Sequence, residues 1–233
     1  YQDFGFDQHI YVVGNEQNYH FQVLVEILKK LEFSWAEKIY HLSYGMVELP
    51  EGRMKSREGK VVDADDLINE MIITARKMSD DLGKLGEIPE ESKAEIYRMI
   101  GLGALKYFIL KVDPKKNMIF NPVESIDFNG NTGPFIQYTY ARINSVLRKS
   151  GTQFSKDFIV ESLNNKEISL IKLLYEFPSI VNSSANEYNP SFIANFMYEV
   201  AREYNQFYHD FSILNADTES QRLTRLLLSK ITG

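Results

Sequence analysis

Apolar and polar positions alternate with two different periods along this chain. Residues His9–Gly14 form an apolar, β-branched run that ends in glycine, which is typical of a buried parallel strand. Residues 17–31 carry apolar side chains at helical spacing and end in lysines that favour the helix dipole. A strand followed by a helix predicts half of a βαβ unit.

Extended segments become rare after the first quarter of the chain. Residues 38–42 and 44–49 are expected to be extended, and residues 50–60 are expected to form a polar loop bounded by glycines. Most later segments have helical periodicity and end at Gly, Pro, Asn or Ser. The expected helices cover 66–81, 89–99, 102–112, 135–149, 168–175, 178–186, 190–209 and 218–231, with a brief extended segment at 118–121.

This order predicts a mostly α-helical protein, in which an α/β remnant is followed by an antiparallel helical bundle. The character changes near residues 127–133. The length of 233 residues allows one large domain or two modest ones, and a hydrophobic share of 44% excludes disordered and fibrous proteins. No apolar run approaches the roughly 20 residues that span a bilayer, so we expect no membrane crossing.

Charge and cysteine content exclude several kinds of functional site. The net charge of −6 opposes attraction of the whole chain to nucleic acid, so any such binding must come from local patches. The chain has no cysteine, which removes disulfides, thiolate nucleophiles and cysteine-based zinc sites. The lack of cysteine fits a reducing compartment. Because the chain begins with Tyr1 and has no signal-peptide pattern, we expect a fragment of a longer protein.

A basic loop is the strongest local signal for chemistry. Arg53, Lys55 and Arg57 would project to one side of residues 50–60 if this segment were extended. Cations on a loop bounded by glycines can close over a polyphosphate and stabilise its developing charge. A solvated basic surface loop is the alternative.

A second signal follows the first predicted strand. Gln17 and His20 are three residues apart, so they share one face at the start of the next helix. Ligands of open α/β sheets lie beyond the carboxyl ends of strands, beside helix N-termini. The alternative is a helix-start glutamine and a surface histidine.

A third signal is a stretch without acidic residues, 131–156, which contains both basic and aromatic side chains. Basic side chains can contact phosphates while aromatic rings stack on unpaired bases. The alternative is that the aromatic rings fill the bundle core. The candidates here are Phe135, Tyr138, Tyr140, Arg142, Arg148 and Lys149, and the last predicted helix adds Arg222 and Arg225 on similar terms.

Other features are interpreted as structural. Asp63, Asp65 and Asp66 suit a helix N-terminus better than a metal site, and no metal site is expected elsewhere. Gly101 and Gly103 are expected to permit close helix packing or to break a helix.

Three segments, taken in order, resemble the carboxyl-terminal half of an arginyl-tRNA synthetase, a class I aminoacyl-tRNA synthetase. They are IYVVGNEQNYHFQVLVEILKKL at 10–31, YGMVELPEGRMKSREGKVVDADDL at 44–67 and GNTGPFIQYTYARINSVLRK at 130–149. They are similar to a strand and helix of the Rossmann catalytic domain, to the Lys-Met-Ser-Lys-Ser signature loop, and to the opening of the helical anticodon-binding domain of Asp-Ala-Leu-Arg type.

The resemblance implies a Rossmann-type catalytic remnant at 1–127 and an all-α anticodon-binding domain at 128–233. The implied activity is that of an arginine-tRNA ligase, which activates L-arginine with ATP and Mg²⁺ and transfers it to the 3′ end of tRNA(Arg). A cytoplasmic monomer without a tightly bound metal is expected. The sequence lacks the His-Ile-Gly-His signature, so we expect no aminoacylation by this fragment alone.

The signature loop departs from the family pattern. By position, Arg53 takes the first lysine, Met54 the methionine, Lys55 the first serine, Ser56 the second lysine and Arg57 the last serine. The resemblance therefore assigns Arg53, Lys55 and Arg57 to catalysis and Met54 and Ser56 to ATP binding. Either Lys55 or Arg57 would replace the missing second lysine.

The remaining roles implied by the resemblance lie outside this loop. It places His20 near the nucleotide and Gln17 near the arginine or adenylate pocket, and Tyr138, Arg142 and Arg148 at the anticodon. Lys149, Arg222 and Arg225 are further tRNA-binding candidates. A cysteinyl-type synthetase and a non-catalytic helical adaptor are the competing interpretations, although the lack of cysteine and the QYTYAR run favour the arginyl type.

Overall fold

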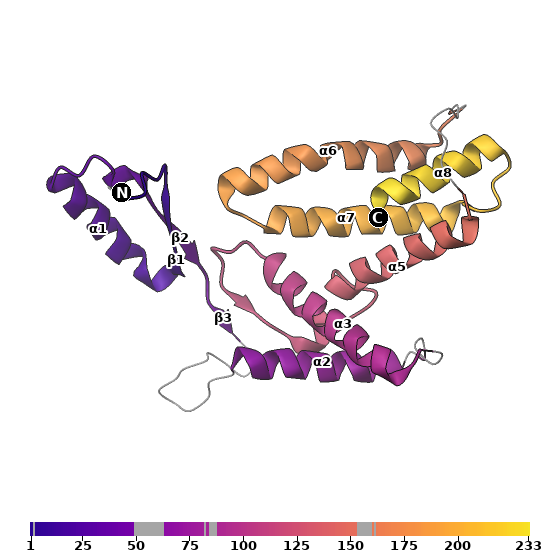
Figure 1. The fold of residues 1–233 in the computed structure, drawn as a ribbon, viewed down its shortest axis with the longest axis horizontal. Helices are drawn as coiled ribbons and strands as arrows, with labels where there is room; N and C mark the ends of the chain where they lie inside the picture. The colour runs from indigo at the N-terminus through magenta and orange to yellow at the C-terminus, as the bar shows by residue number, and fades with distance from the viewer. Residues whose placement is uncertain (2, 49–62, 82, 84–87, 153–159, 161) are drawn as a thin grey trace.

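The computed structural model describes residues 1, 3–48, 63–81, 83, 88–152, 160 and 162–233. A small α/β unit precedes several layers of helices (Figure 1). The elements are β1 (His9–Gly14), η1 (Asn15–Gln17), α1 (Asn18–Lys30), η2 (Ala36–Lys38), β2 (Ile39–Tyr44), β3 (Val47–Glu48), α2 (Ala64–Asp81), α3 (Glu90–Leu110), β4 (Met118–Ile119), α4 (Pro122–Ser125), α5 (Gly133–Ser150), α6 (Asn165–Glu187), α7 (Ser191–Asp210) and α8 (Glu219–Thr232).

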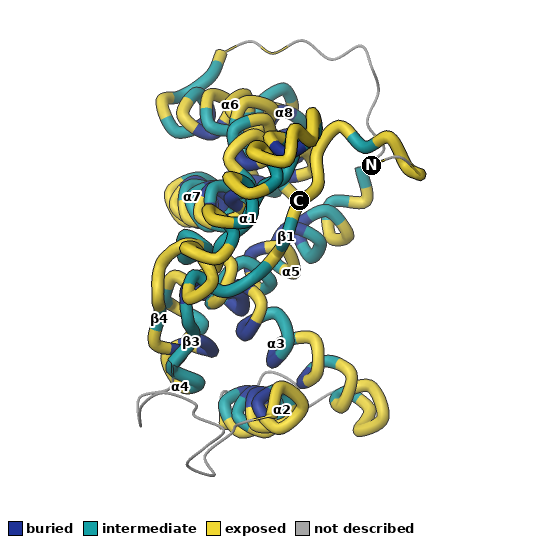
Figure 2. The backbone as a smooth tube through the Cα atoms, turned by 90° about the vertical axis from the view of Figure 1, so that its left-hand side faces the viewer, coloured by how far each residue is buried: buried dark blue, intermediate teal, exposed yellow. Residues whose placement is uncertain are grey.

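The expected half of a βαβ unit is present and is completed by β2. Strands β1 and β2 pair in parallel, with His9 opposite Ile39 and Gly14 opposite Tyr44, and α1 connects them. Aromatic rings hold α1 against the strands, because the Phe21 ring lies 5.0 Å from the ring of Tyr11. Neither α1 nor β1 contains a buried residue (Figure 2), so the strand forms where it was expected, but the prediction that it is buried was wrong.

A second parallel ladder joins β3 to β4, which confirms the brief extended segment predicted near residue 118. The Met118 amide donates to the Met46 carbonyl at 2.9 Å, and the Phe120 amide donates to Glu48 at 2.7 Å. Just before this ladder, the Gly45 amide donates to the Pro114 carbonyl at 2.7 Å. A β-carbon on Gly45 would collide with the Lys116 carbonyl, so this close approach requires glycine.

Helix α3 is continuous, whereas two helices were expected on either side of Gly101. Its glycines allow close packing and do not break it. A β-carbon on Gly101 would lie 2.9 Å from the backbone of Met71 in α2, and Gly133 at the start of α5 touches the Gly103 carbonyl. The core of this region contains Leu67, Met71, Ala75, Ala104, Leu105, Phe120 and Ile126.

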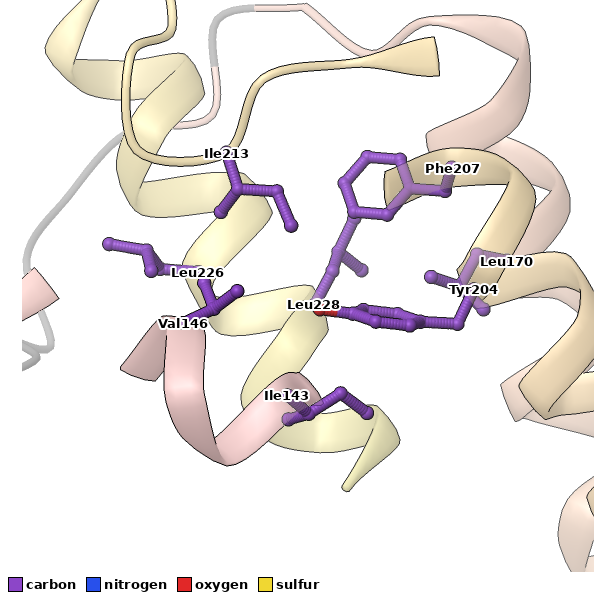
Figure 3. Close-up of a cluster of buried hydrophobic side chains, with 8 residues drawn as sticks. All are labelled: Ile143, Val146, Leu170, Tyr204, Phe207, Ile213, Leu226 and Leu228. Carbon is purple, nitrogen blue, oxygen red and sulfur yellow. The ribbon is translucent and has the colours of Figure 1, made fainter. Parts of the chain in front are cut away.

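Helices α5 to α8 form the bundle predicted for the second half of the chain. Helix α6 runs antiparallel to α7 (Figure 1), and side chains from four helices fill one core (Figure 3). That core contains Ile143, Val146, Leu170, Tyr204, Phe207, Ile213, Leu226 and Leu228. Among the described residues, no helix is long and apolar enough to cross a membrane.

Helix α6 is also continuous, although two helices were expected on either side of Pro178. A proline inside a helix removes one backbone hydrogen bond without necessarily ending the helix. The helix starts with a capping box, in which the Asn164 side chain accepts from the Glu167 amide and the Glu167 carboxylate accepts from the Asn164 amide.

Candidate functional site

Gln17 and His20 lie where the sequence places them, directly after the carboxyl end of β1. Gln17 closes η1 and His20 lies in the first turn of α1. Both side chains are exposed. They are therefore accessible to a ligand at the carboxyl edge of the two-stranded sheet, which is the position typical of ligand sites in open α/β sheets.

A hollow of about 500 Å³ lies on another flank of α1 and includes neither Gln17 nor His20. Its wall is partly formed by the Phe21 ring, which stacks on the His41 ring at 4.2 Å. The Nε2 atom of His41 lies 3.0 Å from the Val13 carbonyl. His41 is thus held by the strand beside it, and the hollow adds no side chain to the predicted nucleotide site.

The signature-loop residues Arg53, Met54, Lys55, Ser56 and Arg57 lie outside the described residues. The structure describes the segment that precedes these residues, which includes β3. There the Met46 amide donates to the Asn117 Oδ1 atom at 2.8 Å, and β3 pairs with β4. The segment before the loop is therefore fixed both by backbone pairing and by a side chain.

Arg142 is the centre of a polar and aromatic group that joins α5 to α7. Its guanidinium carbon lies 4.9 Å from the ring centre of Tyr138 and 4.8 Å from that of Tyr208. It also donates a hydrogen bond to the Asn205 side chain. The Asn205 Nδ2 atom in turn donates to the Thr139 hydroxyl at 2.7 Å. This arrangement holds a cation between two aromatic rings.

The rings on both sides of Arg142 reach the surface. Tyr138 is 37% exposed and Tyr208 is 39% exposed, while Arg142 itself is half-buried. Tyr140, on the same helix α5, is also exposed. Partly exposed rings beside a fixed cation suit stacking of unpaired bases and contact with a phosphate.

Arg148 and Lys149 are both exposed in the last turn of α5. Among the described residues, neither forms an ion pair. Cations at this end of a helix are stabilised by the helix dipole. Helix α5 then ends at Gly151, whose left-handed φ of 58° forms the cap. Both side chains are exposed, so they can contact an external anion.

Arg222 is partly engaged within the bundle. It donates to both carboxylate oxygens of Glu219, at 2.7 and 2.6 Å, and to the Thr152 hydroxyl at 3.0 Å. The hydrogen bonds from Arg222 lower the pKa of the Glu219 carboxyl. Arg222 therefore links the start of α8 to the end of α5, with its side chain still 25% exposed.

Arg225, which the sequence offers as a tRNA contact, lies inside the bundle. Its Nε atom donates to the Glu167 carboxylate at 2.9 Å, and its NH1 atom donates to the Ser212 carbonyl at 2.7 Å. The side chains of Arg225 and Glu167 are only 9% and 3% exposed. This burial favours a structural role for Arg225 over direct contact with an RNA phosphate.

Sequence reasoning missed Tyr208 and Asn205, the partners of Arg142. Their spacing of three places them on one face of α7. That spacing alone does not reveal which helix lies opposite, because Arg142 is 63 residues away from Asn205. Among the described residues, no group of three His, Cys, Asp or Glu side chains could hold a metal ion.

Comparison with known proteins decides the family. Residues 1–122 match the family described as tRNA synthetases class I (R), catalytic domain, and residues 136–233 match the DALR anticodon binding domain. The chain belongs to the arginyl-tRNA synthetase family. This confirms the resemblance and the fold class expected from the sequence, and it favours the arginyl over the cysteinyl type.

Relatives named arginine–tRNA ligase match almost the whole chain. The protein of Bacteroides thetaiotaomicron is 58% identical over 98% of this chain, and that of Porphyromonas gingivalis strain W83 is 53% identical over 100%. The chain spans 39% and 40% of these two relatives. The comparison thus concerns about two fifths of a complete synthetase.

Solved structures show the same fold. The arginyl-tRNA synthetase of Thermus thermophilus superposes with a TM-score of 0.84 at 30% identity, covering 97% of this chain and 38% of its own. That of Plasmodium falciparum gives a TM-score of 0.77 at 26% identity, again covering 97% of this chain and 38% of its own. The α/β unit followed by the helical bundle is therefore the family arrangement.

Proposed function

We propose that the protein containing this chain is an arginine-tRNA ligase, which activates L-arginine with ATP and transfers it to the 3′ end of tRNA(Arg). The observation that carries this proposal is the 58% identity to a protein named arginine–tRNA ligase over 98% of the chain. We propose residues 1–127 as the catalytic part and 128–233 as the anticodon-binding part of a cytoplasmic monomer.

In the activation step, the arginine carboxylate attacks the α-phosphate of ATP and pyrophosphate leaves. We assign stabilisation of the negative charge that develops on the leaving phosphates to Arg53, Lys55 and Arg57, since cations are the groups that such a step requires. Met54 and Ser56 are assigned to ATP binding. Mg²⁺, bound by the ATP phosphates, would neutralise part of their charge.

Two further residues are assigned to the same pocket from the carboxyl edge of the sheet. His20 is assigned to the nucleotide and Gln17 to the arginine or adenylate. Their exposure after β1 supports this assignment, because the carboxyl ends of parallel strands are where α/β folds bind nucleotides. Both side chains can donate a hydrogen bond to a ligand.

The anticodon side is assigned to the face around Arg142. We propose that Tyr138 and Arg142 stack on or contact unpaired bases of tRNA(Arg), and that Arg148, Lys149 and Arg222 contact backbone phosphates. The exposed ring of Tyr138 and the exposed cations at the end of α5 support this face. Arg225 is left out because it is buried against Glu167.

The catalytic assignment is tested by alanine substitution in the full-length protein. Arg53→Ala, Lys55→Ala and Arg57→Ala are compared in ATP–pyrophosphate exchange, and at least one should lower kcat by about 100-fold or more. Lys60→Ala removes the same charge from the same loop outside the signature, so it should change kcat less than threefold. If Lys60→Ala is as damaging as the other three substitutions, the assignment is wrong.

A further inference from the structure

The corner between α6 and α7 contacts the βαβ unit through Tyr188. The ring of Tyr188 lies 4.9 Å from the ring of Tyr40 in β2, with an angle of 32° between the ring planes. The Tyr188 hydroxyl also donates a hydrogen bond to the Gln8 side chain, just before β1. One residue of the bundle thus contacts both the first strand region and the second strand.

Tyr188 occupies a backbone conformation that favours glycine. Its φ of 52° and ψ of 37° are left-handed, and it caps the end of α6. A bulky residue rarely adopts this region, because the β-carbon is strained there, whereas glycine adopts it freely. The large aromatic side chain at this position therefore does not stabilise the local backbone conformation.

The residues after Tyr188 hold this corner in a fixed shape. Asn189 is 8% exposed, and its amide donates to the Ser184 carbonyl at 2.9 Å. The Asn189 Oδ1 atom accepts from the Ser191 hydroxyl at 2.7 Å, and the Ser184 hydroxyl donates to the Asn189 carbonyl at 2.8 Å. These bonds fix the backbone beside Tyr188.

Helix α7 connects this corner to the proposed RNA-binding face. It begins at Ser191, and Tyr208 lies near its other end. A helix of 20 residues is roughly 30 Å long. In Figure 1 the βαβ unit lies beside the end of the bundle at which α6 turns into α7. A change at the Tyr188 contact would therefore be carried along α7 and would shift Tyr208 relative to the α/β unit.

We propose that Tyr188 is a positioning residue, a strut that fixes the orientation of the anticodon-binding bundle relative to the catalytic unit. This inference rests on the proposed function, because it matters only if one tRNA contacts both parts. Two binding sites on one protein raise the overall affinity for a tRNA only when their relative position lets the tRNA contact both at once. Loss of the strut lowers the fraction of molecules in that geometry, and the apparent affinity falls in proportion.

The test uses the full-length protein and two RNA probes, whole tRNA(Arg) and its isolated anticodon stem-loop. Tyr188→Gly removes the ring and keeps the left-handed backbone without strain. It should raise the Kd for whole tRNA about fivefold, as expected for the loss of one aromatic contact, and should leave the Kd for the stem-loop unchanged. The control is Tyr175→Ala, which removes an 86% exposed tyrosine from the same helix and should change neither Kd.

A partner substitution tests whether the contact itself is responsible. Tyr40→Leu should weaken whole-tRNA binding to a similar extent, and the double variant should be no weaker than either single variant. Unchanged whole-tRNA binding by Tyr188→Gly overturns the strut while leaving the proposed function intact. Equal weakening for both probes overturns it in favour of a folding role. Failure of the unaltered protein to bind either RNA overturns the proposed function as well.

Discussion

At the scale of single residues, the same type of side chain serves two different purposes in the bundle. Arg142 is half-buried between two partly exposed rings, whereas Arg225 is buried in an ion pair with Glu167. A fixed cation at the surface can be used by a ligand. A buried one holds helices together, here α8 to the start of α6.

We predict that Arg225→Ala costs about 3–5 kcal/mol in the free energy of unfolding, because it leaves the Glu167 carboxylate buried without its cation. Arg222→Ala, on the same helix, removes a pair whose Glu219 carboxylate is 65% exposed and should cost about 1 kcal/mol or less. Urea unfolding followed by the helical circular dichroism signal measures both. Equal losses would show that the burial of Arg225 contributes nothing.

At the scale of elements, glycine determines how closely helices approach. Gly101 brings α3 against α2, and Gly133 brings the start of α5 against Gly103 of α3. These contacts connect the helices after the signature loop to the first helix of the bundle. The glycines are therefore packing positions, and α3 runs through both of its own without a break.

Gly133→Ala should destabilise the protein by about 1–3 kcal/mol, because its β-carbon collides with the Gly103 carbonyl and backbone must move. Gly14→Ala is the matched control. Its β-carbon would meet the Tyr44 ring at 3.7 Å, an ordinary contact distance, so a change below about 1 kcal/mol is expected. The midpoint of urea unfolding distinguishes the two. If Gly133→Ala leaves the unfolding midpoint unchanged, α3 and α5 can move apart without a loss in the free energy of unfolding.

Local pattern was sufficient to predict most elements, but not their continuity. The apolar run at His9–Gly14 coincides with β1, because β-branched residues ending in glycine have few other interpretations. The breaks expected at Gly101 and Pro178 were wrong. Packing on α2 and α5 stabilises α3 by more than the glycines cost, and α6 tolerates its proline within the bundle.

The candidate site was predictable only where neighbours in sequence are neighbours in space. The run around Tyr138 and Arg142 was identified because the two residues lie one helical turn apart. Tyr208 comes from another helix, so its role required the fold. Periodicity also did not separate the exposed Arg148 from the buried Arg225, since both lie on amphipathic helices.

At the scale of the whole molecule, three regions follow one another: the βαβ unit, the α2–α4 region and the bundle. The β3–β4 ladder and the α3–α5 contact join neighbouring regions, and Tyr188 joins the first to the last. These contacts connect the segment before the signature loop to the helices that carry the face around Arg142. Our central claim is that this face reads the anticodon of tRNA(Arg).

The most direct test is fluorescence-anisotropy binding of the full-length protein to tRNA(Arg), beside the same tRNA with an altered anticodon, across a salt series. We predict preferential binding of the unaltered tRNA, with an affinity that falls steeply as salt rises. Arg142→Ala should weaken binding about tenfold and reduce that preference. Arg202→Ala, which removes an exposed cation of α7 paired with Glu199, should have little effect. Equal affinity for both tRNAs, or no binding at low salt by folded protein, would contradict the claim.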